Sequence, residues 1–358
     1  MFYFLYPLRE HFTIFNLLRY ITFRSAYAAI TSLLVSLIMG RRIICWLEAK
    51  NLREPISKYI EGSHGHKEGT PTMGGIIIFS SLLISVLLWC DLSNRLILYL
   101  ISITVWMGGF GMIDDYMKVR KGDGFRVWQK LVIQVIPALI IGILLICYPL
   151  REGYATMTSA LFLKNMFLNL GYFYIPFLIL VIIGTTNAVN LTDGMDGLAI
   201  GLSGIIAAAF AIVAYVVGNV KFSNYLNILF IGGTGEIAIF CTAFLGSALG
   251  FLWFNSHPAE VFMGDTGSLA IGGILGLIAV LLKQEMLLLV IGGVFVIETL
   301  SVLMQVSSYK IKGKRVLKMA PIHHHFHLLG WEESKIVIRF WIWGILFALL
   351  GLSTLKIR

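Results

Sequence analysis

Long apolar runs alternate with short polar segments along the whole chain, and this alternation predicts the fold. A helix that crosses a membrane needs about 20 mainly apolar residues. The chain offers ten such runs, at residues 21–45, 73–90, 95–113, 129–148, 174–190, 198–218, 235–254, 266–282, 286–307 and 336–355. The pattern therefore predicts an all-α, polytopic integral membrane protein with about ten transmembrane helices.

The composition agrees with this pattern and indicates a single domain. Hydrophobic residues make up 58% of the chain and charged residues 13%, whereas soluble domains contain about 25% charged residues. The polar segments are too short for a separate soluble domain, so we expect one integral membrane domain over residues 1–358. Gly272, Gly273 and Gly276 in one apolar run predict close helix packing.

The first twenty residues are aromatic and apolar, but Arg9, Glu10 and His11 interrupt them. They lack the small-residue cleavage pattern of a signal peptide, so we expect an interfacial helix that leads into the first span.

Four cysteines fall in or at the ends of apolar runs, without the spacing of a metal site. We expect four buried thiols and no disulfide framework. They are Cys45, Cys90, Cys147 and Cys241.

The basic residues predict the orientation in the membrane. Of the 28 Lys and Arg residues, 18 lie in the loops on one side of the predicted bundle, at 41–72, 114–130, 190–197, 255–265 and 308–339. Because cytoplasmic loops carry an excess of Lys and Arg, we expect these loops inside and both termini outside, in the periplasm. Loop bias and anionic lipid account for the net charge of +9, so we expect no nucleic-acid partner.

Five aspartates lie at the edges of apolar runs, on the predicted cytoplasmic face. A charged side chain deep in the bilayer costs roughly 2.5 to 3.5 kcal/mol on insertion scales, so acids beside hydrocarbon usually have a partner. A divalent cation with phosphate is the partner that we expect here, which predicts chemistry at the membrane surface. The five are Asp114, Asp115, Asp193, Asp196 and Asp265.

Asp114 and Asp115 are adjacent at the carbonyl end of the third predicted span. The negative pole of the helix disfavours each carboxylate by roughly 0.3 to 1 kcal/mol unless a cation compensates. The alternative is a solvated acidic pair beyond the helix end, with Lys118 as its partner at helical spacing.

Asn190, Asp193 and Asp196 have a spacing that would place their oxygens on one broad face of a helix. Either aspartate could instead cap the sixth span, and Asp265 could cap the eighth.

Four histidines, His323, His324, His325 and His327, follow five basic residues in the last polar loop. A zinc site is disfavoured, because consecutive histidines do not point at one centre as an i, i+4 pair does, and cysteines do not accompany them. Basic and imidazole donors suit phosphate oxygens and the charge that develops in phosphoryl transfer.

Polar residues in two further segments are open to more than one interpretation. Lys67 and Thr72 precede a glycine pair at a predicted helix start, which could present N–H groups to an anion or form a simple flexible entry. In the ninth span, we interpret Glu298 as a helix-packing partner and Gln305 as a ligand contact.

Five segments together resemble a known family. They are TPTMGG from Thr70, IDDYMK from Ile113, NAVNLTDGMDGLAIG from Asn187, GFLWFNSHPAEVFMGDTGSL from Gly250 and MAPIHHH from Met319. They are similar to the phospho-MurNAc-pentapeptide translocase (MraY) family of the polyprenyl-phosphate N-acetylhexosamine-1-phosphate transferase superfamily. The resemblance covers essentially the whole chain, from the FNLLRYITFRS opening to the TLKIR end.

The resemblance implies the transfer of phospho-MurNAc-pentapeptide from UDP-MurNAc-pentapeptide to undecaprenyl phosphate, which gives lipid I and UMP in peptidoglycan synthesis. It implies a multi-pass enzyme of the bacterial inner membrane with a cytoplasmic active site that needs Mg²⁺, or Mn²⁺ in its place. The bilayer is the third partner, and a homodimer is a compatible assembly.

The resemblance also assigns roles to residues, with Asp265 as the metal ligand. The catalytic residues that it implies are Asp114, Asp115, Asp265, His323 and His324. The substrate-binding residues that it implies are Lys67, Thr72, Asn190, Asp193, Asp196, Asn255, Phe262, Gln305 and His325.

Two departures from the family pattern change the local charge: Glu68 stands where relatives often have a basic residue, and His327 replaces a commonly acidic one. Two mechanisms stay open. One is direct attack by the lipid phosphate with Asp114 as base, and the other is a covalent phospho-enzyme through an aspartate.

Two other functions remain as alternatives. A related transferase for another UDP-sugar would have a different histidine loop, and a secondary transporter would place its ionisable residues near the midplane within paired repeats.

Overall fold

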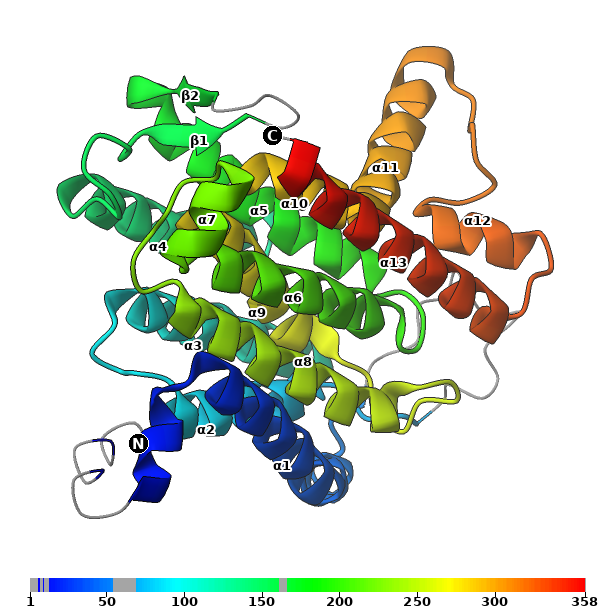
Figure 1. The fold of residues 1–358 in the computed structure, drawn as a ribbon. Coiled ribbons are helices and arrows are strands. Elements are labelled where there is room, and N and C mark those ends of the chain that lie inside the picture. The colour runs from blue at the N-terminus through cyan, green and yellow to red at the C-terminus, as the bar shows by residue number, and fades with distance from the viewer. Residues whose placement is uncertain (1–5, 7–8, 10–12, 54–68, 161–165, 358) are drawn as a thin grey trace.

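The computed structural model of the protein describes residues 6, 9, 13–53, 69–160 and 166–357, which form a helical bundle (Figure 1). The long helices are α1 (Ile21–Ala49), α2 (Gly75–Trp89), α3 (Arg95–Lys121), α4 (Val127–Cys147), α5 (Tyr174–Thr192), α6 (Leu198–Val217), α8 (Gly235–Asn255), α9 (Gly264–Leu281), α11 (Gly293–Lys312) and α13 (Glu333–Ile357). The short ones are α7 (Val220–Leu226), α10 (Glu285–Ile291), α12 (Ile322–Leu328) and the 3-10 helices η2 (Thr13–Arg19) and η3 (Gly171–Phe173).

The helices confirm the expected all-α, polytopic membrane fold. Among the described residues, nine helices are long and apolar enough to cross a membrane, and they overlap nine of the ten apolar runs. The remaining run forms α2, an apolar helix of 15 residues. Just before α2, Gly74 donates its N–H to the carbonyl of Phe262 (2.8 Å), which holds the residues before α2 against another loop.

Helix α9 lies at the centre of the bundle, packed against α3, α5 and α2. Its small residues allow this position, as predicted. An added Cβ at Gly272 would clash with Thr186 Cα on α5, and one at Gly276 would lie 3.0 Å from Ile182 Cα. The other close packing joins α8 to α1 and α6, so α9 and α8 form the core that the remaining helices surround.

The run at 286–307 was expected to form one span, and the structure divides it into α10 and α11. The break falls at the pair Gly292 and Gly293, and glycine is about 1 kcal/mol less favourable than alanine inside a helix. A larger residue does not fit at Gly293, because an added Cβ would lie 2.7 Å from the Phe347 ring of α13. Beyond this break, α11 projects away from the other helices (Figure 1).

Several elements were not predicted. The strands β1 (Met157–Ser159) and β2 (Phe167–Asn169) pair antiparallel, with Thr158 opposite Leu168.

The expectation of four buried thiols was wrong for two of the cysteines. Cys45 and Cys147 are exposed, whereas Cys90 and Cys241 are buried, and all four are free thiols. A span is apolar on every face, so hydropathy cannot tell which face meets protein and which meets lipid.

Candidate active site

Three carboxylates come together where the end of α3 meets the start of α9. Asp114, Asp115 and Asp265 are all buried, and one oxygen of each lies within 4.8 Å of the others. The two helices approach closely because residue 111 is a glycine, whose added Cβ would clash with the carbonyl oxygen of Asp265. The sequence predicted acidic groups at one face, and the structure confirms that these three form one cluster.

Asp115 caps the helix that carries Asp265. Its Oδ1 accepts the N–H of Asp265 (3.0 Å), and its Oδ2 accepts the N–H (2.8 Å) and the hydroxyl (2.7 Å) of Thr266. The alternative that Asp265 is the N-cap of this helix is excluded, because Asp265 lies inside the first turn of α9. A carboxylate from a distant part of the chain satisfies these amides instead, which also offsets its own burial.

Two lysines bridge the three carboxylates. Lys118 Nζ lies 3.0 Å from Asp114 Oδ2 and 2.9 Å from Asp265 Oδ2, and Lys130 Nζ lies 2.7 Å from Asp114 Oδ2 and also contacts Asp265. The sequence indicated Lys118 only as a helical neighbour and missed Lys130. A pairing between α4 and α3 has no local signal, because it depends on how the turn at residues 122–126 folds back.

The cluster has the donors that a hard cation prefers. Carboxylate oxygens are typical ligands of Mg²⁺, which is held by a few carboxylates together with water and phosphate. Asp265 keeps one oxygen beside the lysines, and its Oδ1 accepts the amide of Asn190 (2.7 Å). Asp114 Oδ1 accepts the N–H of Phe125. The three residues therefore fit a divalent cation. Asp114 and Asp265 accept fewer backbone N–H groups than Asp115 does.

The end of α5 connects the carboxylate cluster with the histidines. Asn190, which contacts Asp265, lies in the last turn of α5, and Asp193 is the C-cap residue of this helix. The expected helical face of Asn190, Asp193 and Asp196 does not form, because the helix ends at Thr192 and residues 193–197 make turns. Gly197, with φ +77°, is the N-cap residue of α6.

His323 and His324 converge on these turns. An added Cβ at Gly194 would clash with His323 Nε2 and lie 3.1 Å from His324 Nε2. His323 is fully buried, its Nδ1 lies 3.1 Å from Glu298 Oε1, and its Nε2 has no hydrogen-bond partner among the described residues. Glu298 also accepts the N–H of Ile322 (2.9 Å), which confirms its interpretation as a packing partner.

His325 and Gln305 contact the backbone instead. His325 Nδ1 accepts the N–H of Lys318 (3.2 Å). Gln305 Oε1 accepts the N–H groups of Val316 (3.0 Å) and Leu317 (2.9 Å), and its Nε2 donates to the carbonyl of Leu317 (3.0 Å). Both side chains therefore hold the segment between α11 and α12 in place.

Asp196 and Asn255 hold a second loop, at residues 256–262. Asp196 Oδ2 lies 3.0 Å from His257 Nδ1, and the N–H of Asp196 donates to Glu333 Oε1 (2.8 Å). Asn255 accepts the N–H of Gly197 (3.0 Å) and donates to the carbonyl of Val261 (2.9 Å).

The same loop is tied to the segment before α2. Phe262 donates its N–H to Pro71 (2.9 Å), and the buried Thr72 lies beside Gly264 and therefore near Asp115. Gly264 has φ +71° and leaves no room for a side chain against Asp115. Lys67 and the departure at Glu68 lie outside the described residues.

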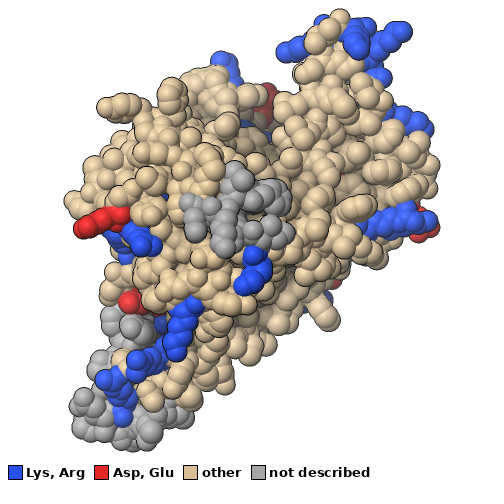
Figure 2. Space-filling model, turned by 45° about the horizontal axis from the view of Figure 1, so that its top comes forward, with Lys and Arg blue, Asp and Glu red and all other residues tan. Residues whose placement is uncertain are grey.

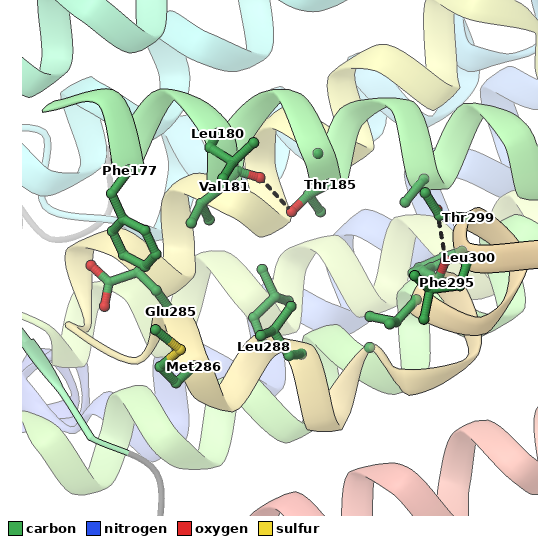
Figure 3. Close-up of a pocket in the computed structure, with 15 residues that line it drawn as sticks. Phe177, Leu180, Val181, Thr185, Glu285, Met286, Leu288, Phe295, Thr299 and Leu300 are labelled. Atoms are coloured by element: carbon green, nitrogen blue, oxygen red, sulfur yellow. Dashed lines mark hydrogen bonds between the residues drawn. The ribbon is translucent and has the colours of Figure 1, made fainter. Parts of the chain in front are cut away.

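An apolar pocket of about 310 Å³ lies between α5 and the pair α10 and α11 (Figure 3). Leu180, Val181, Leu288 and Phe295 are among the residues that line it. Its hydroxyls are engaged with their own helices: Thr185 donates to Val181 O (2.7 Å) and Thr299 to Phe295 O (2.9 Å).

At one end of the pocket, the carboxylate of Glu285 accepts the Thr158 hydroxyl (2.6 Å). The other end reaches Ala188 and Thr299, which lie within one helical turn of Asn190 and Glu298 along their helices. The pocket therefore offers hydrocarbon-like walls that lead towards the polar site.

Known proteins resemble this chain over its whole length. The model of the family described as Glycosyl transferase family 4 matches residues 97–283, and the Phospho-N-acetylmuramoyl-pentapeptide-transferase signature 1 matches residues 67–79. Similar proteins that carry the name phospho-N-acetylmuramoyl-pentapeptide-transferase occur in Citrifermentans bemidjiense (49% identity), Desulforapulum autotrophicum (50%) and Endomicrobium trichonymphae (46%). The first two matches cover 100% of both chains, and the third covers 99% of this chain and 98% of the relative.

Proposed function

This chain belongs to the phospho-N-acetylmuramoyl-pentapeptide-transferase family, and from that premise we propose that it transfers phospho-MurNAc-pentapeptide from UDP-MurNAc-pentapeptide to undecaprenyl phosphate. An oxygen of the acceptor phosphate attacks the donor phosphorus that bears the sugar. The bond from that phosphorus to the bridging oxygen breaks, so UMP leaves and lipid I forms. The observation that carries the proposal is the cluster of three buried carboxylates and two lysines beside an apolar pocket.

Asp265 would hold a divalent cation, for which we propose Mg²⁺, next to the carboxylate of Asp114. When bound, this ion would neutralise phosphate charge and keep the attacking and leaving oxygens in line. Lys118 and Lys130 attract the acceptor phosphate and orient both carboxylates. Asp114 takes the remaining proton of the acceptor phosphate, whose second pKa is about 6 for a phosphate monoester.

The hydrogen bonds of the cluster favour direct attack over a phospho-enzyme. A nucleophilic carboxylate needs a free oxygen, and both oxygens of Asp115 accept protons from the start of α9. These hydrogen bonds count against Asp115 as the nucleophile, and Asp114, whose Oδ2 lies beside two lysines, is assigned the role of base instead. The acceptor phosphate, in contrast, brings its own oxygen nucleophile.

We assign the donor to the side of the site formed by the loop at 256–262 and the turns after α5. The half-buried ring of Phe262 would stack on a nucleobase, and Asp193, Asp196 and Asn255 lie around the same turns. His323 and His324, which reach Gly194, would contact the phosphate or sugar. Thr72 completes this side in the proposal.

The acceptor tail would occupy the apolar pocket along α5, so that its phosphate reaches the carboxylates while its hydrocarbon stays within the membrane. The end of α3 and the start of α9 meet at the carboxylates, and Asn190 at the end of α5 contacts Asp265, which supports one cytoplasmic face for these parts of the site. We therefore place the active site at the cytoplasmic surface of the inner membrane.

A radiolabel assay tests the reaction. The purified protein receives undecaprenyl phosphate and Mg²⁺, with either UDP-MurNAc-pentapeptide or UDP-GlcNAc as the labelled donor. Lipid-soluble label from the first donor alone supports the proposal. Label from UDP-GlcNAc alone would instead assign the protein to a related sugar-1-phosphate transferase, and transport of either donor without transfer would make it a transporter.

A further inference from the structure

The second half of α11 stands clear of the bundle. The buried residues of this helix lie between Gly293 and Ser301, and from residue 302 to 312 none is buried. Figure 1 shows this part projecting from the other helices. This part of α11 is in contact with the medium around the protein. For a chain with these membrane spans, that medium is the lipid bilayer.

The exposed surface of α11 changes character along its length. Leu303, Met304 and Val306 are exposed and apolar, and they suit contact with acyl chains. Beyond these residues, the exposed Tyr309 is followed by Lys310 and Lys312, with the exposed Ile311 between the two lysines. Such an order places the end of the helix at the depth of the lipid head groups, where aromatic and basic side chains gather.

Five basic side chains crowd this end, and we call them the basic tip: Lys310, Lys312, Lys314, Arg315 and Lys318. All five are exposed, and Figure 2 shows Lys and Arg gathered on a projecting end of the molecule. The chain contains no Asp or Glu from residue 299 to 331. Within the described part of the chain, none of the five has a carboxylate within 4 Å.

We propose that the basic tip binds the head groups of anionic phospholipids. Five like charges in nine residues repel each other unless anions lie among them, and an anionic membrane surface supplies these at the right depth. Each Lys or Arg near such a surface contributes about 1 kcal/mol, which corresponds to roughly a fivefold change in affinity. Screening and mutual repulsion reduce the total, so we expect at least a tenfold preference for anionic over zwitterionic lipid.

The basic tip is also hydrogen-bonded to the helix that carries the site histidines. The N–H of Lys318 donates to His325 Nδ1 (3.2 Å), and its Nζ donates to the carbonyl of Leu328 (3.1 Å). Gln305 holds the same segment from the α11 side. Anionic lipid should therefore order α12 as well as the tip, and this second step rests on the proposed function of His323 and His324.

The test uses the full-length protein and a variant with four neutralised charges, K310Q/K312Q/K314Q/R315Q. Lys318 is left intact because its side chain binds Leu328. The matched control, K310R/K312R/K314R, keeps every charge. Native mass spectrometry counts the phosphatidylglycerol or phosphatidylcholine molecules that each detergent-solubilised protein retains during titration, with thermal unfolding as the check on folding.

The natural protein and the arginine control should retain phosphatidylglycerol with at least tenfold higher affinity than phosphatidylcholine, and the glutamine variant should lose most of this preference. Equal retention of the two lipids by the natural protein would overturn the proposal, and so would an unchanged preference in a folded glutamine variant. Because this measurement needs no substrate, its outcome is independent of the transferase reaction.

Activity in nanodiscs tests the second step separately. Phosphatidylglycerol should raise the rate of the natural protein and of the arginine control, and leave the glutamine variant unaffected. A lipid-binding tip without any effect on rate would overturn the link to α12 alone.

Discussion

Glu298 on α11 and His323 on α12 form a hydrogen-bonded pair in which neither side chain has exposed surface. The carboxylate contacts Nδ1, so Nε2 points at Gly194, beside the turns that precede α6. A carboxylate that orients an imidazole is a common arrangement at sites where the other ring nitrogen acts on a ligand. We therefore propose that Glu298 is a positioning residue for His323.

We expect Glu298→Gln and His323→Asn each to lower kcat by roughly tenfold or more, and the double variant to be little worse than His323→Asn. Two residues that act through one contact are not additive, with coupling energies of about 0.5 to 3 kcal/mol. Steady-state kinetics of the cycle measures this coupling. Glu152→Gln, at an exposed position, is the control that should combine additively with His323→Asn, and additive losses for the Glu298 cycle would refute the positioning role.

The acceptor and donor sides should separate in kinetics. Asp114→Asn should lower kcat by about 10² to 10⁴, the usual range for loss of a general base, while nucleotide affinity stays near normal. Asp196→Asn should weaken donor binding instead, because it removes interactions that are present in both the ground state and the transition state. Calorimetric binding of the UDP-sugar accompanies the kinetics. A wild-type kcat for Asp114→Asn would remove it as the base, and equal loss of nucleotide binding in both variants would place the two residues in one subsite.

We expect the activity to depend on a divalent metal ion that Asp265 binds. Chelation should abolish activity and added Mg²⁺ or Mn²⁺ should restore it, whereas Asp265→Asn should lose both activity and metal affinity, because a carboxamide keeps the size but not the charge. Activity after chelation and metal titration by calorimetry are the measurements. Normal turnover after complete chelation contradicts the metal, and undiminished metal binding by the variant removes Asp265 from its ligands.

Loss of the Lys130 ammonium group should lower kcat, as loss of the carboxylates that it bridges should. Lys130→Met removes the ammonium group between Asp114 and Asp265, so we expect kcat to fall by about 10²-fold, as when one charge-stabilising donor is lost. Lys130→Arg keeps the charge and should retain more activity than the methionine variant. Equal and full activity in both variants would show that Lys118 alone suffices.

The predicted orientation can be tested with two exposed positions at opposite ends of the bundle. Cys45 and Cys147, the exposed native thiols, are first replaced by serine. A thiol at Asp123→Cys, after α3, should then be protected from an impermeant reagent added to intact cells, and one at Tyr172→Cys, before α5, should react. The reverse labelling pattern would show that the predicted orientation is inverted.

The sequence predicted the spans well because each depends on a local property, a run of about 20 apolar residues. It failed where the structure depends on contacts between distant segments. The cap of α9 by Asp115 joins residues 150 positions apart, and Lys130 reaches Asp265 across 135 positions. The exposed Cys45 and Cys147 were missed for a different reason, since lipid and protein interior are equally apolar and leave no mark in the composition of a helix.

The carboxylate of Asp115 serves two purposes, because it lies in the proposed reaction centre and also begins the central helix of the bundle. An antibacterial compound that binds this carboxylate would therefore meet a residue with few acceptable replacements. A substitution that weakens the compound would at the same time loosen the start of α9 and displace Asp265. Resistance would have to arise elsewhere, at positions where a change in shape leaves the helix start intact.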